Sequence, residues 1–254
     1  MKPVCLVIGA GAGIGGNVAR RFAQEGYYAV LCRRSNEDGL KKMVKTIQDE
    51  GGEASGFILN AVEESSIEDR ISAVEADIGP IEVLVFNLGA QTGNLSLETT
   101  TYKVFELGWR LATFSLFRAA SILCPLMEKR GKGTVLVTSS TAAMRGNTQQ
   151  HSHAAAMGGQ RMLCQSLNAE YAAGGIHVVH ILIDGLVDAP DTLGKILGPE
   201  RFQDLRESRG LEHDGLLLPE RVADTYYHVS QQHRSAWTHE IDLRPFSESP
   251  WWNS

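Results

Sequence analysis

Short apolar runs rich in Val, Ile and Leu alternate along the chain with longer stretches in which apolar residues recur at helical spacing. The runs lack the polar alternation of a half-exposed strand, so each is predicted to be a strand buried on both faces. They occupy residues 4–8, 28–32, 54–59, 83–86, 134–138 and 177–183. This alternation predicts an α/β fold, a doubly wound parallel sheet with right-handed crossovers and helices on both faces.

The second half of the chain carries longer elements and one irregular segment. We expect long helices at residues 102–130 and 153–173, a shorter helix at 219–231 and a last strand at 237–243. Residues 190–218 fit neither period, and they follow the sixth predicted strand at the sheet edge where open α/β sheets bind ligands. We therefore predict a substrate lid there; the alternative is a surface excursion that touches no ligand.

The composition is that of an ordinary globular protein. The 254 residues are 43% hydrophobic and 21% charged, and no linker, repeat or low-complexity segment divides them, so we expect one domain spanning residues 1–254. No apolar run approaches the roughly 20 residues that cross a membrane. The net charge of −6 is spread over the chain, which disfavours a nucleic-acid partner.

The cysteines and the N-terminus indicate the compartment. Cys5, Cys32, Cys124 and Cys164 lie far apart in apolar runs, without the spacing of a disulfide framework or a zinc site, so we expect reduced core residues and no metal. The chain passes from Met1 and Lys2 directly into the first predicted strand, without the pattern of a secretion signal. A cytoplasmic location follows as an expectation.

A glycine-rich loop comes between the first strand and the first helix. It reads Gly9-Ala10-Gly11-Ala12-Gly13-Ile14-Gly15. Glycines allow a sharp turn and a close approach of the backbone to a pyrophosphate, whose charge then lies at the N-terminus of the helix. Because the loop has its required strand and helix, we predict a dinucleotide site here rather than a simple tight turn.

The end of the second predicted strand indicates which dinucleotide. Cys32-Arg33-Arg34-Ser35 has no acidic residue to meet a ribose 2′-hydroxyl, as an NAD-selective site would. Two guanidinium groups suit a 2′-phosphate instead. We therefore expect NADP(H) in preference to NAD(H); the alternative is that the pair is only solvated.

At this point the sequence resembles the short-chain dehydrogenase/reductase family over nearly its whole length, which implies a Rossmann-type fold. The residues that carry the resemblance are the loop Gly9, Gly13, Ile14 and Gly15, with Asn87-Leu88-Gly89, Asn60-Ala61 and Asp184-Gly185. The resemblance places Asn87 and Gly89 beside the adenine ribose, Asn60 and Ala61 at the adenine, and Asp184 and Gly185 beside the nicotinamide.

The resemblance also shows where the chain departs from the family. The family has a Ser after the fifth strand, a Tyr thirteen residues later and a Lys four beyond that. Counting from Ser140 gives His153 and Met157, and the family's Asn falls at Trp109 or Arg110. A phenol exchanges protons at neutral pH only if a nearby cation stabilises the phenolate, so the family's usual route is excluded on this alignment.

His153 could supply the missing proton, because imidazole titrates near pH 6.5 and is the commonest general acid or base. Against this, imidazole is shorter than phenol, and Gly158-Gly159 weakens the helix that carries it. His153 is therefore either a working acid or only a pocket-lining residue. His151, expected in the preceding loop, is a weaker candidate.

Two functions remain open on the sequence alone. One is an oxidoreductase that moves hydride between NADP(H) and a small carbonyl or alcohol, with Ser140 polarising the oxygen and His153 relaying the proton. The other is a catalytically inactive NADP(H)-binding module, such as a redox sensor or partner-binding subunit. The long helices and the Trp-rich tail at 245–254 also predict a homo-oligomer, a dimer or tetramer as the family resemblance implies.

Overall fold

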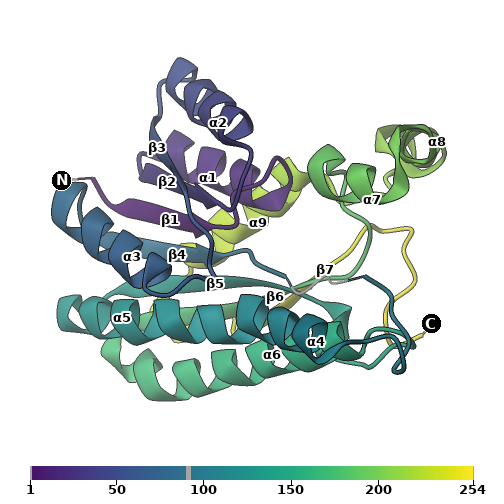
Figure 1. Ribbon diagram of the computed structural model, residues 1–254. Coiled ribbons are helices and arrows are strands. Elements are labelled where there is room, and N and C mark those ends of the chain that lie inside the picture. Colours follow the sequence, from purple (N-terminus) through teal and green to yellow (C-terminus); the bar gives the residue numbers. More distant parts are fainter. Residues whose placement is uncertain (1, 90–92, 254) are drawn as a thin grey trace.

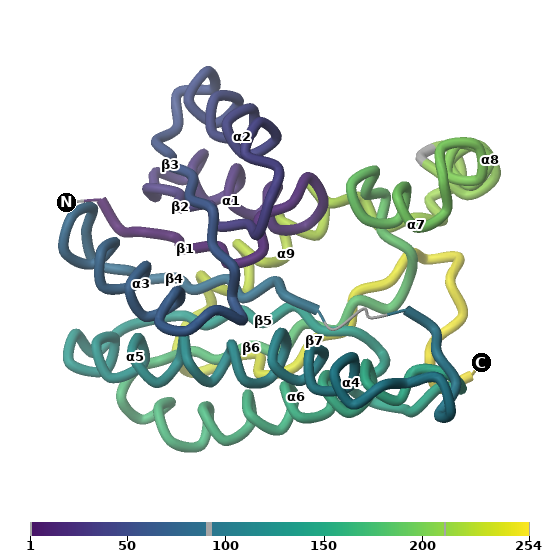
Figure 2. Tube along the Cα trace, viewed as in Figure 1, coloured from purple at the N-terminus to yellow at the C-terminus, as the bar shows by residue number. Residues whose placement is uncertain are grey.

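The computed structural model describes residues 2–89 and 93–253 (Figure 2). Within these ranges seven parallel strands form one sheet in the order β3-β2-β1-β4-β5-β6-β7. The strands are β1 (Val4–Ile8), β2 (Tyr28–Arg33), β3 (Glu53–Ile58), β4 (Ile81–Phe86), β5 (Gly133–Ser140), β6 (Ile176–Ile183) and β7 (Glu240–Leu243). The strand order reverses between β1 and β4, so the predicted doubly wound α/β fold is confirmed.

Helices cover both faces of the sheet (Figure 1). On one face lie α1 (Ile14–Gln24), α2 (Glu37–Asp49) and α9 (Pro219–Ser230); on the other lie α3 (Ser66–Asp77), α4 (Tyr102–Trp109), α5 (Ser115–Arg130) and α6 (His151–Tyr171). Two hydrophobic clusters separate along the same division. β1 shows why its residues are continuously apolar, because Leu6 and Ile8 join one cluster while Cys5 and Val7 join the other.

The helix expected over 102–130 is interrupted by a π-helical turn at Arg110–Phe114, between α4 and α5. At this turn Thr113 Oγ1 donates to the carbonyl of Ala156 in α6 at 2.7 Å. A Cβ at Gly159 would lie 2.9 Å from Thr113 Oγ1. Gly159 therefore weakens α6 intrinsically but lets it pack closely on the π-turn.

One helix among the described residues, Tyr102–Arg130, is long and apolar enough to cross a membrane by length and composition alone. This finding does not contradict the expectation that no apolar run approaches about 20 residues, because Arg110 and Arg118 interrupt the apolar positions of this helix. Half of its most apolar window is buried, and α5 packs on β4, β5 and β6 between its neighbours α3 and α6. It is a partly buried core helix of this fold.

The last strand is shorter than predicted. β7 begins at Glu240 rather than at residue 237, because Trp237 stacks on His177 with ring centroids 4.7 Å apart and its indole donates to the carbonyl of Gln232 at 3.2 Å. The bulk of the expected lid segment is helical. It contains a π-turn (Pro190–Gly194), α7 (Lys195–Leu197), α8 (Pro199–Arg209) and a 3-10 turn (Leu211–His213).

Short 3-10 turns complete the secondary structure at Thr141–Ala143, Ala172–Gly174 and Arg234–Ala236. All four cysteines are buried and unpaired, as expected. Burial raises the pKa of the Cys32 and Cys124 thiols to about 12, so these thiols stay protonated at neutral pH.

Candidate active site

The glycine loop is tightly packed against the end of β4. Gly9 has φ +100°, and a Cβ there would lie 2.4 Å from the Asn87 carbonyl oxygen. A Cβ at Gly15 would lie 2.4 Å from the Gly9 carbonyl oxygen, to which Asn87 Nδ2 donates at 2.9 Å. Asn87 therefore holds the loop in shape, a structural role in addition to the ribose contact implied by the resemblance.

The N-terminus of α1 has the properties of an anion site. Its N-cap, Gly13, offers no side-chain hydrogen bond, and no acidic residue lies in the first turn. The first N–H groups of a helix have no carbonyl partner within the helix, and the helix dipole favours negative charge there. Gly11 adds open space, since a Cβ at this position would meet no atom within 4 Å. Ala12 is exposed beside it.

The two arginines at the end of β2 point into different hollows. Arg33 lines a cavity of about 410 Å³ together with Ala12 and Asp191. Arg34 is exposed and lines a neighbouring cavity of about 520 Å³ together with Asn60. The structure therefore does not bring the two guanidinium groups together, and Arg33 is the one beside the glycine loop.

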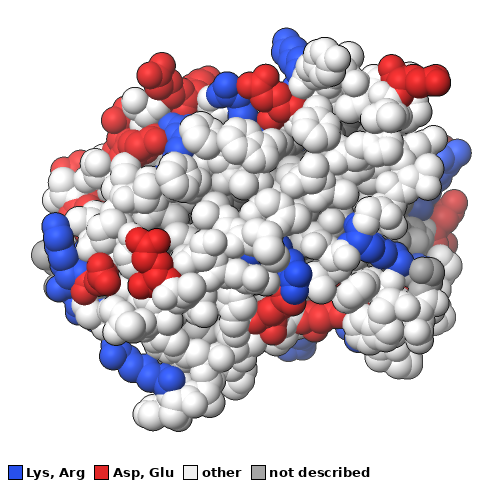
Figure 3. All heavy atoms as spheres, turned by 90° about the horizontal axis from the view of Figure 1, so that it is seen from below, with Lys and Arg blue, Asp and Glu red and all other residues white. Residues whose placement is uncertain are grey.

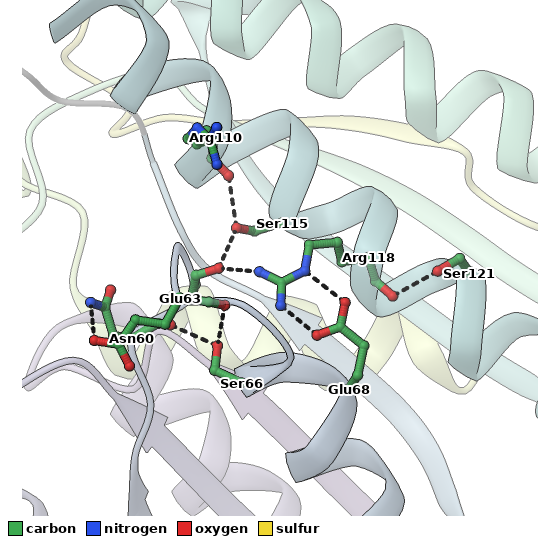
Figure 4. A network of polar contacts seen from close by, with 9 residues as sticks. Asn60, Glu63, Ser66, Glu68, Arg110, Ser115, Arg118 and Ser121 are labelled. Carbon is green, nitrogen blue, oxygen red and sulfur yellow. Dashed lines mark hydrogen bonds and ion pairs between the residues drawn. The ribbon is translucent and has the colours of Figure 1, made fainter. Parts of the chain in front are cut away.

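A polar network fixes the turn that follows β3 (Figure 4). The carbonyl of Ala61 accepts from Arg118 Nη1 at 2.8 Å and from Ser115 Oγ at 3.0 Å. Arg118 also forms an ion pair with Glu68. Ala61 is 4% exposed, so its contribution is to hold Asn60 in place through its backbone.

Three buried polar atoms of residues that line these cavities have no hydrogen-bond partner within the described residues: Arg33 Nη1, Asn60 Oδ1 and Arg70 Nε. Such atoms are costly unless something pairs with them. Arg33 Nη1 is a donor suited to a phosphate oxygen, and Asn60 Oδ1 is an acceptor suited to an adenine amino group. The residues present therefore fit the adenosine half of a nicotinamide dinucleotide.

Ser140 and His153 come together as the sequence alignment requires. Ser140 ends β5, His153 lies in the first turn of α6, and Ser140 Oγ is 3.2 Å from His153 Nε2. Met157, one turn further on, is 1% exposed and packs with Ala112, Ala142 and Ala156. The position next to His153 is thus hydrophobic rather than cationic.

Other predicted positions are placed as follows. His151 begins α6 rather than lying in the preceding loop, and its side chain is exposed. Trp109 is 43% exposed and stacks on Phe114, with ring centroids 5.3 Å apart. Gly89 is exposed at the end of β4. None of these contacts Ser140 through a hydrogen bond recorded for the described chain.

The C-terminal tail folds back onto Asp184 and Gly185. Asp184 accepts from Arg244 Nη1 and from the Trp251 backbone N–H, both at 3.1 Å. Gly185 has φ +155°, and a Cβ there would lie 2.7 Å from Pro245. The tail therefore lies at the end of β6, where the resemblance places the nicotinamide.

Comparisons with known proteins agree with this fold. A family described as short chain dehydrogenase matches residues 3–192. The 3-oxoacyl-[acyl-carrier-protein] reductase of Thermotoga maritima is 26% identical over 242 residues, 94% of each chain. The 7alpha-hydroxysteroid dehydrogenase of Escherichia coli is 27% identical over 219 residues, 86% of this chain and 83% of that one. The crystal structure of a short-chain dehydrogenase from Rhodopseudomonas palustris, 31% identical, superposes with a TM-score of 0.79 and covers 96% of this chain and 99% of that one.

The chain belongs to the short-chain dehydrogenase family. It is an oxidoreductase of the class that exchanges hydride between a nicotinamide cofactor and carbonyl or alcohol groups.

Sequence reasoning missed two features of this region. Asp191 pairs with Arg33 from 158 positions further along the chain, and no sequence pattern indicates this pair. Arg145 Nη1 donates to the carbonyl of Trp251 at 2.6 Å, which ties the tail to the loop after β5. The expected apolar tail is only partly buried, because Phe246 is 83% and Trp252 is 56% exposed.

Proposed function

We propose that the protein is an NADP(H)-dependent oxidoreductase for a small carbonyl or alcohol substrate, in which Ser140 and His153 replace the family's usual acid. The observation that carries the proposal is the 3.2 Å contact between Ser140 Oγ and His153 Nε2. This distance is within the range in which a proton can pass between two groups. The sequence register that puts histidine in the tyrosine position is supported by this contact.

The binding residues follow from the geometry above. Gly13, Ile14 and Gly15 present the α1 N-terminus to the pyrophosphate, and Arg33 presents an unpaired donor to a 2′-phosphate. Asn60 Oδ1 accepts from the adenine. NADP(H) is preferred because β2 ends in arginines and in no acidic residue.

A bound reduced nicotinamide supplies the hydride to the substrate carbonyl carbon. Ser140 Oγ–H donates to the carbonyl oxygen and stabilises the charge that develops there. As the alkoxide forms, the Ser140 proton moves to it and the His153 imidazolium replaces that proton through Nε2–H. His153 ends neutral and regains its proton from solvent, and alcohol oxidation runs the same path in reverse.

Met157 has a further consequence for this scheme. A buried thioether beside the acid can neither stabilise a phenolate nor hold the nicotinamide ribose with a charge. Imidazole requires no such cation to exchange a proton near neutral pH. Replacement of the tyrosine and loss of the lysine are therefore chemically consistent with each other.

The test has two stages on one preparation. Calorimetric titration with NADPH and NADH measures binding, and a panel of aldehydes and ketones with NADPH measures turnover. We expect tighter NADPH binding and turnover that falls strongly in Ser140→Ala. If NADPH binds but the parent never turns over, while His153→Tyr with Met157→Lys gains carbonyl reduction, the protein is the inactive binding module instead.

A further inference from the structure

The segment that follows β6 lies directly on the glycine loop and on Arg33. A Cβ at Gly13 would lie 3.0 Å from Ala189 Cβ and 3.9 Å from Thr192 Oγ1. Between these two residues, Asp191 Oδ2 lies 3.7 Å from Arg33 Nη2. The start of the lid segment is therefore placed over the cavity that the cofactor's adenosine half would use.

The Arg33 side chain is closely surrounded in this position. Its side chain is only 12% exposed, and its Nη1 lies so close to α2 that a Cβ at Gly39 would be 3.1 Å from it. One edge of the guanidinium thus faces Asp191, while Nη1 is buried without a partner in the described chain. A guanidinium whose charge is already partly balanced by a nearby carboxylate attracts a second anion less strongly.

Asp191 has a second cation of its own. Lys195 Nζ lies 3.5 Å from Asp191 Oδ1, one helical turn further along the same segment, and is largely exposed. If Arg33 turned to another anion, Asp191 would keep a partner that moves with the lid. Of the two ion pairs of Asp191, the pair with Arg33 therefore joins the lid segment to the sheet.

We propose that Asp191 competes with the 2′-phosphate of the cofactor for Arg33, so that it sets the selectivity between the phosphorylated and unphosphorylated dinucleotides and latches the lid segment. The inference rests on the proposed NADP(H) function. A 2′-phosphate placed at Arg33 meets the Asp191 carboxylate and is repelled by it, whereas a ribose 2′-hydroxyl can share the site with the carboxylate. Because such coupling is reciprocal, a ligand that takes Arg33 from Asp191 also loosens the lid.

The experiment uses the adenosine halves of the two cofactors, so that no turnover is needed. Binding of 2′,5′-ADP and of 5′-ADP is measured by calorimetry on the full chain and on Asp191→Asn. We expect Asp191→Asn to bind 2′,5′-ADP roughly two- to fivefold more tightly, the scale of one partly exposed ion pair. Binding of 5′-ADP should change little.

Asp188→Asn is the matched control. Asp188 lies on the same segment, carries the same charge and pairs with Arg206 at 3.2 Å within the lid region. Its removal loosens the lid without freeing Arg33, so both affinities should stay near those of the parent. Hydrogen exchange across residues 189–197 gives a second measurement: 2′,5′-ADP should accelerate it in the parent, and 5′-ADP should not.

The outcomes separate this inference from the function on which it rests. Equal gains for both ligands in Asp191→Asn, or a gain as large in Asp188→Asn, would overturn the competition with Arg33. An unchanged 2′,5′-ADP affinity in Asp191→Asn would overturn it as well. If the parent binds both ligands equally and Arg33→Ala changes neither, the NADP(H) assignment fails; if neither ligand binds, the dinucleotide site fails.

Discussion

At the scale of single residues, the strongest consequence concerns His153. If it is the acid, His153→Ala should lower kcat for carbonyl reduction by about 10²–10⁴-fold, because a positioned acid contributes that much. In the parent, reduction should weaken as pH rises, because a neutral imidazole is a far weaker acid than an imidazolium. The measurement is NADPH oxidation with an active carbonyl compound from pH 5 to 9.

His151→Ala is the control for that measurement, because His151 is exposed at the first position of α6 and makes no recorded bond to Ser140. Its rate and pH profile should match the parent. An unchanged rate and profile in His153→Ala would instead leave His153 as a pocket-lining residue, with the proton coming from water or substrate.

The proximity of Ser140 and His153 could be predicted from the family resemblance, which sets their spacing along the chain, and the structure has Ser140 Oγ 3.2 Å from His153 Nε2. That Arg33 and Arg34 line different cavities could not be predicted. Successive side chains leave a strand on opposite sides, but which hollow each enters depends on α2 and on the distant Asp191. Arg33 and Arg34 were expected to bind one phosphate together because they are adjacent in sequence, but packing places their side chains in different cavities.

At the scale of elements, the glycine loop offers a matched pair of substitutions. Gly15→Ala puts a methyl group 2.4 Å from the Gly9 carbonyl oxygen and 2.8 Å from Asn87 Nδ2. Backbone or Asn87 must shift, so we expect a loss of about 1–3 kcal/mol in the free energy of unfolding, typical of overpacking, and much weaker NADPH binding. Urea denaturation and calorimetry measure the two effects.

Gly11→Ala is the companion variant, because a Cβ there meets nothing within 4 Å. The free energy of unfolding should fall by less than in Gly15→Ala, and any loss of NADPH binding would then report contact with the nucleotide itself. Comparable destabilisation in both variants would contradict this account of the loop.

The order of strands and helices could be predicted because each strand is apolar on both faces. The π-helical turn between α4 and α5 and the start of β7 could not. The π-turn at Arg110–Phe114 depends on Thr113 reaching α6, a tertiary contact with no local pattern. The last strand, β7, was predicted to begin too early, because Trp237 has strand propensity. The Trp237 ring stacks on His177 instead.

At the scale of the whole molecule, stability should depend on pH through His180. This side chain is 0% exposed in β6 and has a pKa lowered from 6.5 to about 4, chiefly by burial, against the opposing effect of Glu240. Arg161, which binds Glu240, and His239 lower it further. The unfolded chain therefore takes up this proton first as pH falls.

The contribution of His180 to the free energy of unfolding should therefore be complete above pH 6.5. It should decline between pH 6.5 and 4, by about 3 kcal/mol in total. In His180→Gln the side chain cannot titrate, so the slope of unfolding free energy against pH in this window should become shallower. Urea denaturation at several pH values measures it, with the exposed His228→Gln as the comparison. Equal slopes in the parent and His180→Gln would refute the assignment to His180.

Self-association is the remaining property of the whole molecule. The face that carries α5 and α6 has wide areas without charged side chains (Figure 3). Phe117 in α5 is 52% exposed and Trp109 in α4 is 43% exposed, and both flank Phe114 in a stacked series with centroid separations of 6.4 and 5.3 Å. Exposed aromatic side chains of this kind mark interfaces.

We therefore expect a homo-oligomer that buries α4 and α5, and light scattering at micromolar concentration should give a multiple of the 27.7 kDa chain mass. Phe117→Glu places a charge in the stacked series, and burying it unpaired in an interface is costly, so the mass should fall toward that of one chain. Ile196→Glu, at a 67% exposed position on α7, adds the same charge elsewhere and should leave the assembly intact. A parent that is already monomeric would rule the assembly out. Loss of assembly in both variants would place the interface at the lid as well.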